Sequence, residues 1–233
     1  SKDVDFVVVR ENTEDAYAGI GGILKKGTPH EVAMQQMVYT RHGVERVVRY
    51  AYETARKRDR HKKLLLVDKA NAIRAQDIWT RTFAEVGEEF PDIEQDHAYV
   101  DAACMWMIKN PESFDTVVTT NLFGDIITDL GAVLQGGMGV AASGNINPGQ
   151  VSLFEPIHGS APKYKGQNVS CPIAAIAAVY MMLHELGEIS SASKIEHAIE
   201  KVLNREDVNS VSASSGVSTD EWGDRVIEAL RQL

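Results

Sequence analysis

A short apolar run that leads directly into an acidic segment constrains the fold of this chain more than any other stretch. Residues 115–120 are rich in β-branched side chains and predict a buried strand. Residues 121–129 follow at once, with a change of chain direction expected at Gly124. Asp125 is expected to start a helix, on which Asp129 lies one turn further along the same face. Ligands gather at the carboxyl ends of sheet strands. The aspartate pair therefore predicts a site for Mg²⁺ or Mn²⁺, and the alternative is a solvated acidic face.

The rest of the chain alternates apolar strands with amphipathic helices, which predicts an α/β protein. In the first part we expect strands over 5–10, 63–67 and 93–99, helices over 40–55, 76–89 and 100–108, and a hairpin arm over 19–39. Further along we expect a flexible corner over 135–139, a loop over 142–148, a short strand near 153, a buried helix over 173–183, and helices over 192–204 and 219–233.

Charge and cysteine content exclude several classes of partner. The net charge of −9 and the pI near 5.3 argue against nucleic acid and anionic membranes as partners. Cys104 and Cys171 have neither metal-binding nor disulfide spacing, which favours a reducing compartment. The longest apolar run, residues 173–183, is too short to span a bilayer. We therefore expect a cytoplasmic protein.

Further chemistry-bearing side chains follow the predicted strands. Arg10 ends one strand and is expected either to form a structural ion pair or to grip a substrate carboxylate. Lys69 follows another and is either a surface charge or, held in a cleft, a base. Tyr17 and Asp101 lie in flanking segments, and a tyrosine is more often a packed aromatic than a catalyst. Together these groups suit a carboxylated hydroxy acid as substrate.

Four motifs carry a resemblance that covers essentially the whole chain. They are RENTEDAY at 10–17, DKAN at 68–71, NLFGDIITD at 121–129 and EPIHGSAP at 155–162. In this combination they resemble the β-decarboxylating dehydrogenases, which include isocitrate, 3-isopropylmalate, homoisocitrate and tartrate/D-malate dehydrogenases. The resemblance implies an isocitrate/isopropylmalate dehydrogenase-like α/β fold. It also implies an oxidoreductase that uses a divalent cation and NAD(P).

The resemblance assigns a role to each candidate residue. Arg10 would bind the substrate's carboxylates, and Tyr17 would protonate the enol after CO₂ leaves. Lys69 would take the hydroxyl proton in the partner subunit's site. Asp101 of one subunit would join Asp125 and Asp129 of the other on Mg²⁺ or Mn²⁺. The cation would polarise the C2 oxygen and stabilise the enolate.

The resemblance also places the cofactor-binding segment in the last part of the chain. Its expected contacts are Glu155, His158, Gly159, Ser160, Ala161, Lys163, Tyr164 and Cys171. Where NAD-dependent members usually carry an Asp, this chain has Lys163, which suits the 2′-phosphate of NADP, so NADP is expected and NAD is the alternative. Cys171 departs from the Asn usual at its position.

Members of the family begin with about a hundred further residues, so the chain resembles a fragment or one piece of a split enzyme and is expected to be inactive alone. We expect a central, dimer-forming substrate domain over 1–134 and the C-terminal part of the NAD(P)-binding domain over 135–233. RENTE favours isocitrate as substrate, whereas 3-isopropylmalate, homoisocitrate and tartrate/D-malate stay open. A truncated, non-catalytic or regulatory subunit is the alternative of another class.

The predicted arm carries more apolar side chains than a solvated hairpin normally does. These are Ile20, Ile23, Leu24, Val32, Met34 and Met37. The resemblance implies that such arms interlock across a two-fold axis. We therefore expect a homodimer with a shared active site.

Overall fold

Four parallel strands form the sheet of the first half of the chain in a computed structural model, which describes residues 4–233. The strands pair in the order β1-β6-β4-β5. Their bounds are β1 Val7–Arg10, β4 Lys63–Asp68, β5 Glu94–Tyr99 and β6 Thr116–Thr119. Because all pairs are parallel, the carboxyl ends of the strands meet at one edge of the sheet, where ligands gather in α/β proteins.

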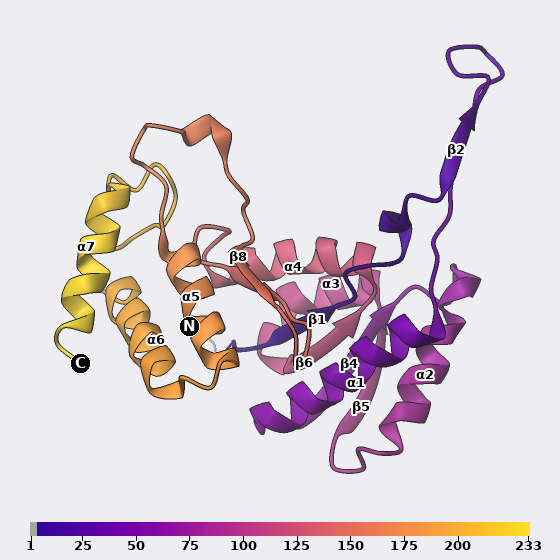
Figure 1. Cartoon of the computed structure of the whole chain (residues 1–233), viewed down its shortest axis with the longest axis horizontal. Coiled ribbons are helices and arrows are strands. Elements are labelled where there is room, and N and C mark those ends of the chain that lie inside the picture. The colour runs from indigo at the N-terminus through magenta and orange to yellow at the C-terminus, as the bar shows by residue number, and fades with distance from the viewer. Residues whose placement is uncertain (1–3) are drawn as a thin grey trace. The chain divides into compact units, whose positions relative to one another are not determined.

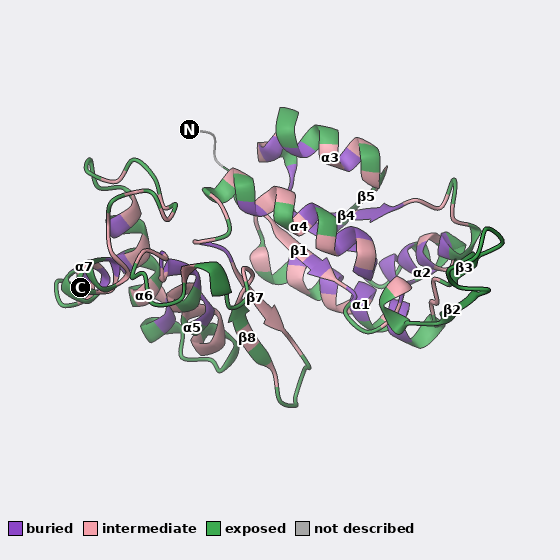
Figure 2. Ribbon diagram, turned by 90° about the horizontal axis from the view of Figure 1, so that it is seen from above, coloured by how far each residue is buried: buried purple, intermediate pink, exposed green. Residues whose placement is uncertain are grey.

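Helices cover both faces of this sheet, α1 and α2 on one face and α3 and α4 on the other (Figure 1). Their bounds are α1 Arg41–Arg58, α2 Asp77–Gly87, α3 Val100–Lys109 and α4 Asn121–Gln135. Thr40 caps α1, because its hydroxyl accepts from the Gly43 N–H. The core on the α1–α2 side is built around Tyr52, Trp79 and Phe83. Figure 2 shows this burial along α1 and the central strands.

The predicted arm is an antiparallel hairpin of β2 Gly21–Leu24 and β3 Val32–Gln35. It projects from the sheet and helices of its own half of the chain (Figure 1). Every residue of both strands is exposed, which Figure 2 shows as an unbroken exposed stretch. The arm therefore adds nothing to the core of this half.

The chain divides into two compact units, Ser1–Leu130 and Gly131–Leu233, so the boundary lies inside α4. The boundary expected from the sequence, after residue 134, lies four residues further along the same helix. The second unit pairs two antiparallel strands, β7 and β8, and has three helices within its described residues. The bounds are β7 Ala142–Asn145, β8 Leu153–Pro156, α5 Ile173–Glu185, α6 Ile189–Leu203 and α7 Thr219–Leu230. Trp222 is fully buried at the centre of its core.

Three local predictions were wrong. The helix α4 begins at Asn121, so Asp125 lies in its second turn and Gly124 is a helix-interior residue rather than a corner. The predicted loop over 142–148 contains β7. The helix α5 is not buried along its length, because Val179 is 43% exposed and only Ile173, Ala174 and Ala178 are buried among its residues.

The early start of α4 has a long-range cause. The Asp15 carboxylate accepts the N–H of Leu122 at 3.0 Å and satisfies one of the helix's first donors. A partner more than a hundred positions away in the sequence leaves no local capping signal.

Across residues 4–233, the structure contains no helix long and apolar enough to cross a bilayer.

Candidate active site

Arg10 lies at the carboxyl end of β1 and contacts the start of α4. Its Nε and Nη2 donate to Asn121 Oδ1 at 3.1 and 2.8 Å, and its Nη1 lies 3.0 Å from Asp125 Oδ1. Gly124 leaves room for this arrangement, since a Cβ there would lie 2.4 Å from Arg10 Cγ. The guanidinium is therefore held in a fixed orientation, with its side chain still 26% exposed.

Tyr17 is held on the same guanidinium. It lies in the short 3₁₀ helix Ala16–Ala18, and the Arg10 Cζ is 5.4 Å from the centroid of its ring. The tyrosine is 54% exposed. Arg10, Tyr17 and Asp125 thus form one cluster, which joins a carboxylate-binding cation, a hydroxyl and a carboxylate.

Lys69 and Asp101 form a second cluster at the ends of β4 and β5. Lys69 Nζ lies 2.5 Å from Asp101 Oδ1 and 5.5 Å from the centroid of the Tyr99 ring. The hydrogen bond from the Lys69 ammonium holds the pKa of Asp101 below its usual value. Asp101 is 70% exposed, so its carboxylate is accessible from solvent.

The three aspartates expected to bind the cation do not converge within one chain. Among residues 4–233 no group of three or more His, Cys, Asp or Glu side chains could hold a metal ion. Asp125 and Asp129 are one helical turn apart on α4, and Asp129 is exposed. Their carboxylate oxygens are the donor type that Mg²⁺ and Mn²⁺ prefer, and a third carboxylate would have to come from elsewhere.

The predicted cofactor segment lies in the second unit. Glu155 is on β8 and accepts from Asn145 Nδ2 at 3.3 Å, and His158 Nδ1 contacts the Gly159 carbonyl at 2.7 Å. Gly159 and Ala161 both have positive φ, 61° and 40°, and the backbone turns over residues 157–160.

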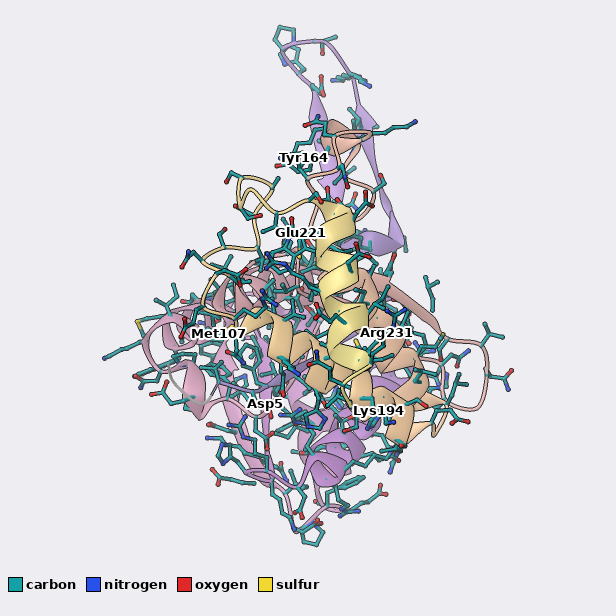
Figure 3. The ribbon with its side chains drawn as sticks, turned by 90° about the vertical axis from the view of Figure 1, so that its left-hand side faces the viewer. Asp5, Met107, Tyr164, Lys194, Glu221 and Arg231 are labelled. Carbon is teal, nitrogen blue, oxygen red and sulfur yellow. The ribbon has the colours of Figure 1, made fainter. Side chains whose placement is uncertain are left out.

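Lys163 and Tyr164 follow in a 3₁₀ turn, with the Lys163 Nζ 4.6 Å from the centroid of the Tyr164 ring. Figure 3 marks Tyr164 on this turn, and the Lys163 side chain is exposed. Cys171 is different, because it is 6% exposed and belongs to the core of the second unit. Burial raises the pKa of its thiol. The side chain of Cys171 is thus packed against protein.

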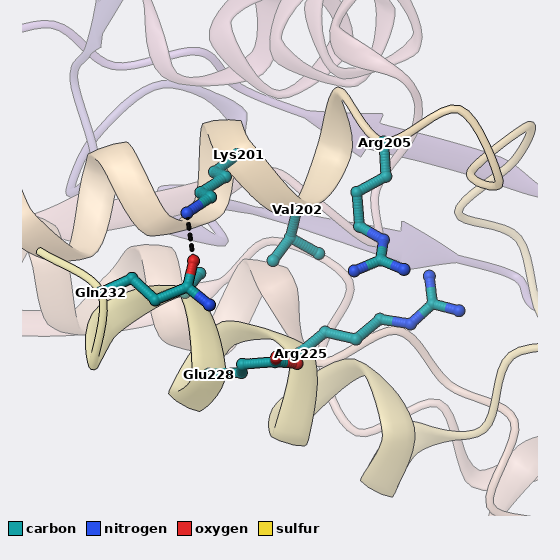
Figure 4. Close-up of a pocket in the computed structure, with 7 residues that line it drawn as sticks. Lys201, Val202, Arg205, Arg225, Glu228 and Gln232 are labelled. Carbon is teal, nitrogen blue, oxygen red and sulfur yellow. Dashed lines mark hydrogen bonds between the residues drawn. The ribbon is translucent and has the colours of Figure 1, made fainter.

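A separate small cavity of about 90 Å³ lies between α6 and α7 (Figure 4). Lys201, Arg205 and Arg225 line it, and Lys201 donates to Gln232. Asp207 pairs with both arginines, at 2.9 and 3.1 Å, and Glu221 also pairs with Arg225. With Glu228, which also lines the cavity, these carboxylates balance its three cations, so the cavity lacks the charge of an anion site.

The structure adds three residues to which the sequence gave no role. Asn121 fixes Arg10, Tyr99 packs on Lys69, and Asp15 caps α4. Asn121 and Asp15 lie inside the motifs NLFGDIITD and RENTEDAY, so their place in these motifs could have marked them as site residues. The contact of Tyr99 depends on the register of β4 with β5 and has no local signature.

The family model for isocitrate/isopropylmalate dehydrogenase matches residues 1–226. The chain belongs to the isocitrate/isopropylmalate dehydrogenase family. Its curated relatives include 3-isopropylmalate dehydrogenases from Thermobifida fusca, 50% identical over 99% of this chain and 65% of the relative, and from Corynebacterium glutamicum, 47% identical over 98% of this chain and 66% of the relative. A crystal structure of isocitrate dehydrogenase from Methylococcus capsulatus is 41% identical with a TM-score of 0.90, covering 99% of this chain and 68% of that one.

These likenesses confirm the resemblance and the predicted α/β fold of the isocitrate/isopropylmalate dehydrogenase family. The chain spans about two thirds of the length of the curated relatives it matches.

Proposed function

We propose that this chain is part of an oxidoreductase that oxidatively decarboxylates a 2-hydroxy acid bearing a 3-carboxylate, with a divalent cation and NAD(P)⁺. One observation carries the proposal. At the carboxyl edge of a parallel sheet, Arg10 is fixed by Asn121 and Asp125 and lies beside Tyr17. This cluster combines a group that binds carboxylates bidentately with a hydroxyl that can donate a proton.

The proposed roles balance as a reaction. Lys69, after giving up its own proton and as the neutral amine, accepts the proton of the substrate hydroxyl while the hydride on C2 passes to NAD(P)⁺, which leaves a ketone. The bond to the 3-carboxylate then breaks, CO₂ leaves, and Tyr17 returns a proton to C3. A divalent cation, when bound by Asp125 and Asp129 with Asp101 of a second copy, supplies positive charge beside the developing enolate oxygen. Arg10 orients the substrate's carboxylates.

The first candidate substrate is 3-isopropylmalate. Relatives that are 46–52% identical to this chain carry the name 3-isopropylmalate dehydrogenase. Isocitrate, favoured by the sequence, is the second candidate, because Asn12-Thr13 replaces the Leu-Thr of typical isopropylmalate enzymes and because the 41% identical structure is an isocitrate dehydrogenase.

The test is made on the enzyme at the full length of its relatives. Formation of reduced nicotinamide is followed with 3-isopropylmalate or isocitrate, with NAD⁺ or NADP⁺, and with Mn²⁺ or a chelator. We expect cation-dependent turnover of 3-isopropylmalate, which Tyr17→Phe lowers about 100-fold or more. Turnover of isocitrate alone would select the second candidate. Absence of turnover with either acid would contradict the proposed reaction.

A non-catalytic role is the proposal's alternative. The proposed catalytic set of Tyr17, Lys69, Asp101, Asp125 and Asp129 is complete in this chain, which supports the enzyme over a regulatory subunit.

A further inference from the structure

A chain of partly buried hydrogen bonds joins the end of β4 to the start of α4. The backbone N–H of Lys69 donates to Gln76 Oε1 at 2.6 Å, and Gln76 Nε2 donates to the Tyr39 hydroxyl at 2.8 Å. That hydroxyl donates to Asp15 Oδ1 at 2.9 Å, and Asp15 Oδ2 accepts from the Leu122 N–H at 3.0 Å. Each polar atom along this path has a partner.

The middle of the path lies largely away from water, whereas Lys69, Tyr39 and Leu122 are partly buried. Gln76 and Asp15 are fully buried, and the ring of Tyr39 packs edge-on against the buried Trp79, with the ring centroids 6.3 Å apart. Burial raises the pKa of Tyr39 well above its ordinary value, so its hydroxyl stays protonated and donates. Removing the Tyr39 hydroxyl takes the acceptor from Gln76 Nε2 and one donor from Asp15 Oδ1. Losing such partners away from water is costly.

Asp15 holds the segment that carries Tyr17 in an unusual conformation. Its φ of 69° and ψ of −147° lie in a region that side-chain-bearing residues rarely adopt. Its backbone N–H donates to the Val38 carbonyl at 2.8 Å, and its carboxylate caps the Ala16 N–H at 2.8 Å. Contacts of this kind are needed to keep a strained residue in place.

The backbone of Lys69 is held on both sides. Gln76 accepts its N–H, while its carbonyl accepts the N–H groups of Ala72 and Ile73, both at 2.9 Å. The Cα of Lys69 is therefore fixed in position, and its side chain extends from there to Asp101.

We propose that Tyr39 and Gln76 are positioning residues that hold Lys69 and, through Asp15, the segment of Tyr17 in one rigid frame. This inference rests on the proposed function, which gives both groups a proton-transfer role. Neither Tyr39 nor Gln76 needs to touch the substrate. Their hydroxyl and amide groups fix the backbone positions from which the Lys69 and Tyr17 side chains extend. Small misplacements of reacting groups lower rates steeply.

The test compares Tyr39→Phe with Tyr52→Phe in the enzyme at the full length of its relatives. Tyr52 is a matched control, because it lies buried in the same core, its pKa is also raised by burial, and its hydroxyl donates only to the Phe83 carbonyl, at 3.1 Å. We expect Tyr39→Phe to lower kcat about 10- to 100-fold while KM for the hydroxy acid stays within about threefold. The isotope effect on kcat from deuterium at substrate C2 should rise in Tyr39→Phe and stay at the wild-type value in Tyr52→Phe.

Gln76→Leu removes the same path from its other end and should reproduce the kinetic pattern of Tyr39→Phe. Equal kcat loss in the Tyr39 and Tyr52 variants, without a rise in the isotope effect, would overturn the inference and leave the proposed function standing.

Hydrogen exchange at the Lys69 amide gives a readout that does not depend on activity. We expect this amide to exchange about tenfold faster in Tyr39→Phe than in Tyr52→Phe once each rate is corrected for global stability. Unchanged exchange would overturn the inference even in a protein that oxidises none of the tested acids.

Discussion

Gly124 shows how a missing side chain can position a charged one. Glycine inside a helix normally costs about 0.5–1 kcal/mol relative to alanine. Here the Arg10 side chain occupies the space that a Cβ would need, 2.4 Å from its Cγ. The glycine therefore makes room for a contact between β1 and α4 that brings Arg10 to Asp125.

Gly124→Ala should destabilise the protein by about 1–3 kcal/mol, because the added methyl group overpacks against Arg10. Gly223→Ala in α7 is the matched control, since a Cβ there meets nothing within 4 Å. The control should gain about 0.5–1 kcal/mol. Urea unfolding of both variants measures the two effects, and equal stabilisation would contradict the role given to Gly124.

Lys163 lies on an exposed turn beside Tyr164 and is proposed to bind the 2′-phosphate of NADP. Lys163→Asp should shift kcat/KM about 10- to 100-fold from NADP⁺ toward NAD⁺, because a charged contact worth about 1.5–3 kcal/mol becomes a repulsion. Lys165→Asp, an equally exposed lysine two positions on, should leave the ratio unchanged. A wild-type enzyme that strongly prefers NAD⁺ would contradict the NADP assignment.

The helices and strands of the first unit were largely predictable from hydrophobic period and β-branched runs. The four strands of the sheet and α1 to α3 lie close to their expected ranges. Two of the three failures come from contacts outside the segment itself. The start of α4 depends on Asp15, and β7 is a strand because it pairs with β8.

The candidate site was predictable as a set of residues and not as a geometry. Arg10, Tyr17 and Asp125 are brought together, and Lys69 pairs with Asp101. Strand order and register separate these residues into two clusters within one chain. Local sequence patterns do not encode strand order or register.

The arm formed by β2 and β3 exposes apolar side chains that its own unit does not cover. Ile23, Leu24, Val32 and Met34 are each 47–57% exposed. We propose that a second copy covers these side chains. Replacing Ile23 and Val32 by serine should then leave the far-UV spectrum unchanged but dissociate the expected dimer at micromolar concentration, because burying each apolar side chain is worth about 1.5–3 kcal/mol.

Val151→Ser is the control for the arm, since Val151 is 91% exposed on the turn between β7 and β8. Sedimentation of the control should match wild type. A wild-type protein that sediments as a monomer would contradict the role given to the arm.

At the scale of the whole molecule, the two clusters imply that a complete site needs two chains. We propose that one chain supplies Arg10, Tyr17, Asp125 and Asp129, and that its partner supplies Lys69 and Asp101. Family membership is the support for this proposal. Such a dimer has two equivalent sites related by its two-fold axis.

Hybrid dimers test this shared site most directly. Asp101→Asn and Asp125→Asn should each bind Mn²⁺ weakly and turn over little substrate, because every site lacks one carboxylate. Refolding the two variants together should restore about a quarter of wild-type activity, since half of the dimers are hybrids with one intact site in two. Asp77→Asn, which alters a surface aspartate of α2 paired with Arg81, is the control and should stay fully active. The predicted result is recovery to about a quarter of wild-type activity in the mixed dimers. Mixed dimers that are no more active than the two parent variants would contradict the shared site.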